Sequence, residues 1–180
     1  MNKRLLMLVG IAGSGKSTWA HEYAKDKVRQ GYHTTIVSRD MIRFSLVAEN
    51  EKYFSKEKQV FEEYIENLQF ALKDPEIDII IADATHINQI SREKILKRLE
   101  LQNIIVEAIV FYTPLSKCLQ QNSKRQGRTK VPEPAIYTMQ KHFMTPTLEE
   151  GFDIITRAGV ALCKNEEKES EEITLSNFIR

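Results

Sequence analysis

The stretch GIAGSGKSTWA, residues 10–20, directly follows the apolar run RLLMLV at residues 4–9. Gly10, four intervening residues, and then Gly15, Lys16 and Ser17 give the spacing of a P-loop. In that motif backbone N–H groups surround phosphate oxygens, and the next helix adds its positive N-terminal end. A glycine turn could match the same letters by chance. We favour the phosphate loop because a strand pattern precedes the motif and a helix pattern follows it.

Individual residues of this motif have distinct expected roles. Lys16 is expected to reach the β- and γ-phosphates of a nucleotide, and the Ser17 hydroxyl to ligate Mg²⁺. Lys16 is therefore predicted to be catalytic as well as nucleotide-binding. The nucleotide-binding residues predicted within the motif are Gly13, Ser14, Gly15, Lys16, Ser17 and Thr18.

Strand and helix patterns alternate along the rest of the chain, and most strand patterns are nearly continuous apolar runs. This predicts an α/β fold of the P-loop NTPase type, with a parallel sheet covered by helices on both faces. Ligands of such folds gather at the carboxyl ends of the strands. The predicted strands are 5–9, 33–37, 77–82, 104–111 and 152–155, and the predicted helices are 17–30, 40–48, 55–73, 88–100, 114–124 and 134–144.

Composition limits the possible classes of protein. With 180 residues, 42% of them hydrophobic, the chain is long enough for one buried core, so residues 1–180 are predicted to form one domain. The 26 basic and 25 acidic residues nearly balance, whereas proteins that coat long duplexes usually carry a basic excess. No apolar run approaches the ~20 residues of a membrane span. The first residues resemble a signal peptide, but the glycine–lysine motif explains them better, so we expect a cytoplasmic protein that contacts no membrane, with Cys118 and Cys163 reduced.

A second candidate site residue ends an apolar run in the stretch IDIIIADATHIN, residues 77–88. Asp83 at the carboxyl end of this strand can hold Mg²⁺ beside the P-loop, as a Walker B aspartate does, although many strands end in Asp simply as a turn signal. The next residue is Ala84 rather than the water-activating Glu of many ATPase motors. We also assign Asp83 and Asn88 to the substrate side of the site.

The stretch VSRDMIRFS, residues 37–45, follows the second predicted strand. Asp40 and Arg43 are three residues apart at a helix start, where they could be no more than a capping pair. In a P-loop fold this strand end faces the γ-phosphate region. A carboxylate there can accept the proton of an attacking hydroxyl, and an arginine beside it can bind an acceptor phosphate.

The stretch KRQGRTKVPEP, residues 124–134, is basic and non-periodic and is predicted to form a lid. A solvated basic loop is the simpler alternative, but a kinase needs cations that neutralise charge during transfer and a lid that excludes water. Arg125 is the first candidate and Arg128, assigned to nucleotide binding, the second. The charged segment 164–180 is expected to be solvated surface.

Other conspicuous residues receive no chemical role. Trp19 and Tyr23 are four apart on a predicted helix and are expected to pack together. The histidines lack the spacing of metal ligands and are expected at the surface or on helices: His21, His33, His86 and His142. We assign no base stacking to the aromatic residues at 53, 61, 64 and 70.

Taken in order, the blocks GIAGSGKSTWA, SRDMIRFSL, the Asp83 strand end, QNSKRQGRTKVP and MQKHF resemble the polynucleotide 5′-hydroxyl kinase family of bacteriophage, over most of the chain. The resemblance implies ATP as phosphate donor, Mg²⁺, and the 5′-hydroxyl end of DNA or RNA as acceptor. It also implies Asp40 as general base, Arg43 as the arginine that binds the acceptor phosphate and Arg125 as the catalytic lid arginine.

The chain departs from that family in two places. Met41 follows Asp40 where the phage enzyme has a second Asp, and no DxDGT-like phosphatase motif follows the kinase region. We therefore predict a kinase of polynucleotide 5′ ends without phosphatase activity. A kinase of a nucleoside or metabolite is the alternative, and a nucleotide-dependent binding switch is a third possibility, although no NKxD-type guanine-reading sequence occurs.

Overall fold

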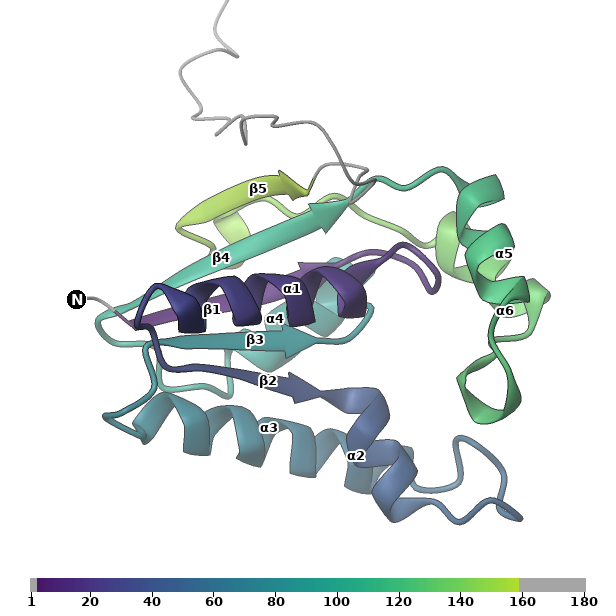
Figure 1. Cartoon of the computed structure of the whole chain (residues 1–180), viewed down its shortest axis with the longest axis horizontal. Helices are drawn as coiled ribbons and strands as arrows, with labels where there is room; N and C mark the ends of the chain where they lie inside the picture. Colours follow the sequence, from purple (N-terminus) through teal and green to yellow (C-terminus); the bar gives the residue numbers. More distant parts are fainter. Residues whose placement is uncertain (1–2, 159–180) are drawn as a thin grey trace, which may run out of the picture.

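The protein is described by a computed structural model that places residues 3–158. Its strands form one five-stranded sheet in the order β2-β3-β1-β4-β5, and every neighbouring pair is parallel (Figure 1). The predicted α/β fold of the P-loop NTPase type is thereby confirmed. The strands are β1 (Lys3–Val9), β2 (Thr34–Ser38), β3 (Ile79–Asp83), β4 (Ile104–Phe111) and β5 (Ile154–Ala158).

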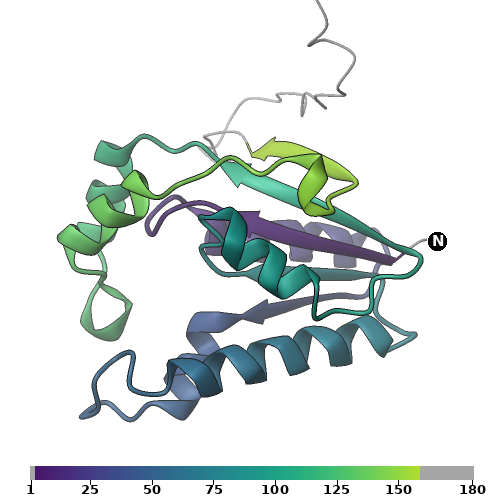
Figure 2. The same cartoon turned by 180° about the vertical axis from the view of Figure 1, so that it is seen from behind.

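The central strand β1 is buried on both faces, which explains its continuous apolar sequence. Because side chains alternate along a strand, Leu6 and Leu8 point to one face and pack in a cluster with Ala20 of α1 (Lys16–Arg29). Leu5 and Met7 point to the other face, into a larger cluster under α3 (Glu57–Lys73) and α4 (Gln89–Leu96). Figures 1 and 2 show α1 on one side of the sheet and α4 on the other.

The remaining helices lie around the carboxyl ends of the strands. They are α2 (Arg39–Leu46), α5 (Leu115–Ser123) and α6 (Glu133–Lys141), with a short 3₁₀ turn at Gly127–Thr129 between α5 and α6. A second 3₁₀ turn, Leu148–Glu150, precedes β5. Between α5 and the P-loop a small apolar cluster forms from Ile11, Ala12, Cys118 and Ile136. The cluster anchors the α5–α6 pair beside the P-loop, so the segment 124–134 that connects these two helices begins and ends next to the site (Figure 2).

Most predicted elements are present, with shifts at their ends. The last strand occupies Ile154–Ala158 rather than 152–155, because it pairs with β4 from Glu107 to Phe111. The predicted helix 88–100 ends at Leu96. The charged segment 164–180 and Cys163 lie outside the described residues. Within residues 3–158, no helix is both long enough and apolar enough to cross a bilayer.

Candidate active site

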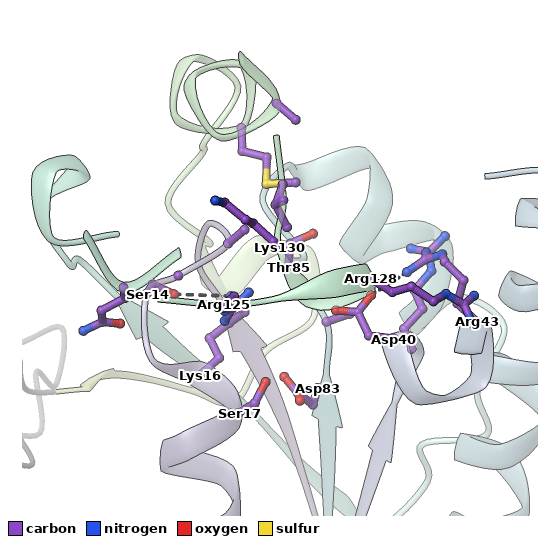
Figure 3. A pocket seen from close by; sticks show the side chains of 18 of the residues that line it. Ser14, Lys16, Ser17, Asp40, Arg43, Asp83, Thr85, Arg125, Arg128 and Lys130 are labelled. Atoms are coloured by element: carbon purple, nitrogen blue, oxygen red, sulfur yellow. Dashed lines mark hydrogen bonds and ion pairs between the residues drawn. The ribbon is translucent and has the colours of Figure 1, made fainter. Parts of the chain in front are cut away.

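The carboxyl ends of the strands, α2 and the segment 124–134 surround a cavity of about 1240 Å³ (Figure 3). This volume exceeds the 300–1,000 Å³ of a typical small-ligand pocket, so it has room for two reactants. Asn88, a predicted substrate residue, does not line it. The predicted site residues that do line it are Gly13, Ser14, Gly15, Lys16, Ser17, Thr18, Asp40, Arg43, Asp83, Arg125 and Arg128.

The loop between β1 and α1 has a backbone that glycine permits and other residues do not. Gly13 and Gly15 have φ angles of 79° and 96°, in the left-handed region. A Cβ atom on Gly13 would also lie 2.4 Å from the carbonyl oxygen of Cys118. The Thr113 hydroxyl donates a hydrogen bond of 2.8 Å to the carbonyl of Ser14. The start of α5 therefore packs directly on the loop and fixes its shape.

The side chain of Lys16 folds over this loop. Its Nζ donates to the carbonyl of Ile11 at 2.8 Å and to the hydroxyl of Ser14 at 3.3 Å. Lys16 is only 7% exposed, and burial lowers its pKa to about 8, an effect that the Asp83 carboxylate opposes. An ammonium group with so little solvent around it interacts strongly with any anion that the loop binds.

Ser17 and Asp83 face each other at the base of the cavity (Figure 3). Asp83 is 7% exposed, and burial raises the pKa of its carboxyl, whereas a hydrogen bond from Ser17 and the charge of Lys16 lower it. Within residues 3–158, no group of three or more His, Cys, Asp or Glu side chains forms a metal cage. A hydroxyl and one carboxylate nevertheless fit Mg²⁺, which commonly takes one or two protein ligands and completes its shell with phosphates and water.

Across the cavity, Asp40 presents a largely exposed carboxylate from the first turn of α2. Ser38 occupies the N-cap position, so the alternative that Asp40 caps this helix is wrong. The predicted neighbour Arg43 does pair with Asp40, donating from Nη1 to Oδ1, and the hydroxyl of Tyr53 donates to the same oxygen at 3.1 Å. Both donors meet Oδ1, which leaves Oδ2 for another partner.

Arg43 is more constrained than the sequence indicated. It is 5% exposed, and its Nη2 donates to both carboxylate oxygens of Glu57, at 3.0 and 3.2 Å. Its guanidinium also lies over the rings of Tyr53 and Phe54, 4.8 and 5.5 Å from their centroids. Sequence reasoning missed Glu57 and Tyr53, because no local spacing connects residues 40–43 with residues 53–57.

The segment 124–134 reaches across the mouth of the cavity. Arg125 lines the cavity, with a weak hydrogen bond of 3.4 Å from its Nη1 to the carbonyl of Thr129. Arg128 extends to the opposite wall, where it donates to the carbonyl of Val47 at 2.7 Å and lies 4.9 Å over the ring of Phe44. This position, near Arg43 in Figure 3, is on the α2 wall rather than the P-loop wall.

The prediction for His86, at the surface or on a helix, is wrong. His86 lies in the loop after β3, 4% exposed, with a φ of 43°. Its Nδ1 is 2.7 Å from the carbonyl of Leu8 and must donate to it, so Nε2 accepts from the hydroxyl of Tyr64 at 3.2 Å. Burial lowers the pKa of His86 to about 3. His86 is therefore neutral, and both of its ring nitrogens have hydrogen-bond partners in the core beneath the site.

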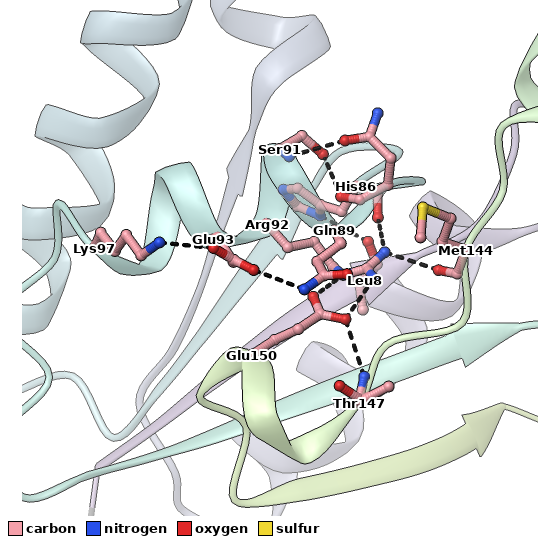
Figure 4. A network of polar contacts seen from close by, with 11 residues as sticks. Leu8, His86, Gln89, Ser91, Arg92, Glu93, Lys97, Met144, Thr147 and Glu150 are labelled. Carbon is pink, nitrogen blue, oxygen red and sulfur yellow. Dashed lines mark hydrogen bonds and ion pairs between the residues drawn. The ribbon is translucent and has the colours of Figure 1, made fainter.

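A buried ion pair fixes the same loop from the other side (Figure 4). Arg92 and Glu150 are joined by two hydrogen bonds of 2.6 and 2.7 Å, and Arg92 also donates to the carbonyls of His86 and Met144. Asn88 caps α4 nearby, where its Oδ1 accepts from the amide of Ser91 at 2.8 Å. These residues position backbone, and sequence reasoning missed Arg92 and Glu150 because they are 58 positions apart.

The predictions for Trp19, Tyr23 and Cys118 can also be compared with the structure. Trp19 and Tyr23 stack with ring centroids 4.7 Å apart, as predicted for packing residues. Trp19 also meets the edge of Phe111 at 5.8 Å and lines the cavity. Cys118 is a free, buried thiol.

Comparison with known proteins finds relatives of similar sequence and of similar fold. The chain is similar to L-seryl-tRNA(Sec) kinase of Methanococcus maripaludis, with 27% identity over 160 residues, covering 83% of this chain and 56% of the relative. This chain therefore spans little more than half the length of that protein.

Solved structures with a similar fold include the following two. A chain of the Pnkp1/Rnl/Hen1 RNA repair complex matches with a TM-score of 0.63 and 22% identity, over 78% of this chain and 43% of that one. Kti12 of Chaetomium thermophilum in complex with ADP-AlF3 matches with a TM-score of 0.64 and 14% identity, over 87% of this chain and 89% of that one.

A family model, described as an AAA domain, matches residues 5–146. The matched region begins in β1 and continues past α6, so it includes the P-loop, the Asp83 strand end, α2 and the segment 124–134. Because this match covers most of the chain and the residues around the cavity, the chain belongs to the AAA domain family AAA_33.

Proposed function

We propose that this protein is an ATP-dependent kinase that transfers the γ-phosphoryl group of ATP to the 5′-hydroxyl end of an RNA or DNA strand. The observation that carries the proposal is the position of Asp40. Its exposed carboxylate lines the same cavity as the P-loop, opposite Lys16 and beside the Ser17–Asp83 pair. A phosphate cradle facing a proton acceptor is the arrangement that phosphoryl transfer to a hydroxyl requires.

The donor phosphates are bound by the P-loop in this proposal. Its N–H groups and the start of α1 hold the phosphate oxygens, and Lys16 turns from Ile11 and Ser14 to the β- and γ-phosphates. Ser17 and Asp83 would hold Mg²⁺, which neutralises charge on the phosphates.

Asp40 acts on the acceptor. Its Oδ1 is held by Arg43 and Tyr53, so Oδ2 accepts the proton of the attacking hydroxyl. The acceptor oxygen forms a bond to the γ-phosphorus as the bond to the β–γ bridging oxygen breaks, and that electron pair leaves with ADP. Arg125 neutralises the charge that develops on the transferring group.

Three observations support a nucleic-acid end as acceptor. The relative in Methanococcus maripaludis is by name a kinase of a charged tRNA, and one structural neighbour belongs to an RNA repair complex. The nearly balanced charge of the chain suits a protein that binds a few nucleotides at a strand end rather than a long duplex.

The test is transfer from γ-labelled ATP with Mg²⁺ to a panel of acceptors. The panel contains RNA and DNA oligonucleotides with a 5′ hydroxyl, the same oligonucleotides with a 5′ phosphate, seryl-tRNA, free nucleosides and sugar acids. We expect label on the 5′-hydroxyl oligonucleotides and none on their 5′-phosphate counterparts. Lys16→Met protein measures contaminating kinase activity.

Three results would overturn the proposal. Label found on nucleosides or sugar acids alone makes the protein a small-molecule kinase, and label on seryl-tRNA alone makes it a kinase of an aminoacyl group. ATP binding with no turnover stimulated by any acceptor would instead favour a nucleotide-dependent switch.

A further inference from the structure

The α2 wall of the cavity, which we call the acceptor wall because it carries Asp40 and Arg43, has an aromatic surface. The proposed transfer of phosphate does not use this surface. Phe54 is 67% exposed and still lines the cavity. Its ring meets Tyr53 edge to face, with centroids 4.8 Å apart, and Tyr53 in turn meets Phe44 at 6.3 Å. An apolar ring supported from behind and open toward a cavity is a ready stacking surface for a planar ligand.

This surface lies directly beside the proposed proton acceptor. The hydroxyl of Tyr53 donates to Asp40, and the guanidinium of Arg43 contacts Asp40 as well as both rings. In a nucleoside the base and the 5′ hydroxyl are attached to the same sugar. A nucleoside whose 5′ hydroxyl meets Asp40 can therefore reach Phe54 with its base.

The wall near Phe54 also carries carboxylates that can accept hydrogen bonds from a base. Glu49 and Glu51 line the same cavity; Glu51 accepts a hydrogen bond from the amide of Ala48 at 2.9 Å and pairs with Lys56 at 3.1 Å. Carboxylate oxygens accept hydrogen bonds from the amino groups of bases. A flat, neutral ligand that carries N–H donors suits this wall.

We propose that the exposed face of Phe54, supported by Tyr53, stacks on the base of the terminal nucleotide whose 5′ hydroxyl is phosphorylated. The inference rests on the proposed function, since it specifies how that acceptor is bound. Stacking of a base on an aromatic side chain is sequence-tolerant, because every base has a π-face. The protein should therefore bind strand ends with little preference among the four bases but discriminate against an end that lacks a base.

The experiment compares two acceptors, a 5′-hydroxyl oligonucleotide and the same strand with an abasic 5′-terminal residue. The variants are Phe54→Ala, Phe54→Trp and the control Phe70→Ala. Phe70 is 75% exposed on α3 and lies outside the cavity. We expect Phe54→Ala to raise KM for the normal strand by roughly 10- to 100-fold, with KM for the abasic strand and KM for ATP unchanged. Phe54→Trp should retain the preference for a base, and Phe70→Ala should behave as wild type.

Equal effects of Phe54→Ala on the normal and abasic strands would overturn the proposal, because the ring would then act on the structure and not on the base. A rise in KM for ATP would overturn it in favour of a contact with the donor adenine.

Binding separates this proposal from the proposed function. Fluorescence anisotropy of the two strands, labelled at the 3′ end, is measured with a non-hydrolysable ATP analogue. If wild type prefers the normal strand and Phe54→Ala abolishes this preference, stacking on Phe54 is supported even when no transfer is found. Equal binding of the two strands by wild type overturns it. If the protein transfers phosphate but binds the normal and abasic strands equally, the proposed kinase activity stands and the proposed stacking on Phe54 is overturned.

Discussion

The P-loop wall and the α2 wall of the cavity differ in what forms them: one is mainly backbone, the other mainly side chains. The P-loop wall, where the nucleotide would bind, consists largely of backbone: two glycines in the left-handed region, the start of α1 and the carbonyl of Ile11 that accepts from Lys16. The acceptor wall consists of side chains from two segments, with Arg43 held between Asp40 and Glu57. A backbone wall keeps its shape when a side chain changes, whereas a wall of paired charges can be altered by one substitution.

The pairing on the acceptor wall also changes how Arg43 must be understood. The sequence presented it as a free cation for an acceptor phosphate, but in the structure its charge is already met by two carboxylates. A phosphate that binds Arg43 has to compete with Glu57. The four predictions below test the difference between the two walls, beginning with the largest expected effect.

Lys16→Met is expected to abolish transfer and to stabilise the fold. The ammonium that would contact the β- and γ-phosphates is lost, and loss of such a group typically costs at least ~10²- to 10³-fold in kcat. Burial holds the pKa of Lys16 at about 8, below its ordinary 10.5. The charged lysine therefore opposes folding at pH 7, and wild-type stability rises between about pH 8 and 10.5.

Methionine keeps the apolar stem without the charge, so the Lys16→Met variant should unfold at a higher temperature at pH 7. It should also lack the rise in stability above pH 8. Thermal unfolding from pH 7 to 10 measures the two effects on stability, and the transfer assay measures the loss of activity. An unfolding temperature below that of wild type would show that the contacts of Nζ with Ile11 and Ser14 outweigh its burial.

Asp40→Asn is expected to lower kcat by roughly 10²- to 10⁴-fold. Asparagine retains the shape of the side chain and can keep the contact with Tyr53, but it cannot accept the proton of the acceptor hydroxyl. ATP affinity, measured by titration with an analogue, should remain that of wild type because the P-loop wall is unchanged. A variant that loses only thermal stability would reduce the Asp40–Arg43 pair to a structural contact.

Glu57→Gln is expected to lower KM for an acceptor that carries a phosphate, by roughly 3- to 10-fold, with a smaller change in kcat. The neutral amide releases Arg43 from one of its two carboxylates, and a hydrogen-bonded charge of this kind contributes on the order of 1 kcal/mol. Glu62→Gln is the matched control, since Glu62 of α3 pairs with Arg98, which follows α4, outside the cavity. A higher KM would mean that Glu57 orients Arg43 for the acceptor.

His86→Asn tests the support beneath both walls and should have the smallest effect on activity. The pKa of His86 is about 3, against an ordinary 6.5, so the unfolded chain binds a proton that the folded protein excludes between these pH values. Wild-type stability therefore falls as pH drops below 6.5, by at most ~1.4 kcal/mol per pH unit from this group.

Asparagine tolerates the positive φ at position 86 but does not titrate. We expect the variant to be about 1 kcal/mol less stable at pH 7, where it lacks the contacts with Leu8 and Tyr64. We also expect a flatter dependence of stability on pH from 6.5 to 4.5. Urea unfolding at several pH values measures this, with His142→Asn as an exposed control. An unchanged slope would show that other groups cause the acid sensitivity.

The P-loop wall could be predicted from sequence because its determinants are local. Gly10, Gly15, Lys16 and Ser17 have fixed spacing, and the apolar run of β1 identifies the strand that leads into them. The alternation of strand and helix patterns likewise gave the parallel sheet. Pairing with neighbours decides where an element ends, which is why the last strand was displaced.

The rest of the site depends on contacts between distant residues. Glu57 meets Arg43 across 14 positions, and Glu150 meets Arg92 across 58. A lone histidine after a strand carries no signal that a carbonyl and a tyrosine lie within reach. Asn88 was assigned to the substrate, although an asparagine directly before a helical pattern is also a typical cap, which is the contact that it makes.

Helix α5 has a mechanical consequence for the cavity. Near its start the carbonyl of Cys118 touches Gly13, and near its end Asn122 holds the lid through two hydrogen bonds to the backbone of Val131, of 2.7 and 2.9 Å. A helix of nine residues is a stiff rod of ~13 Å. It connects the phosphate loop to the segment 124–134, which carries Arg125 and Arg128. We expect a displacement of Gly13 to shift the segment 124–134 through this rigid helix, which would couple the occupancy of the loop to the position of Arg125 and Arg128.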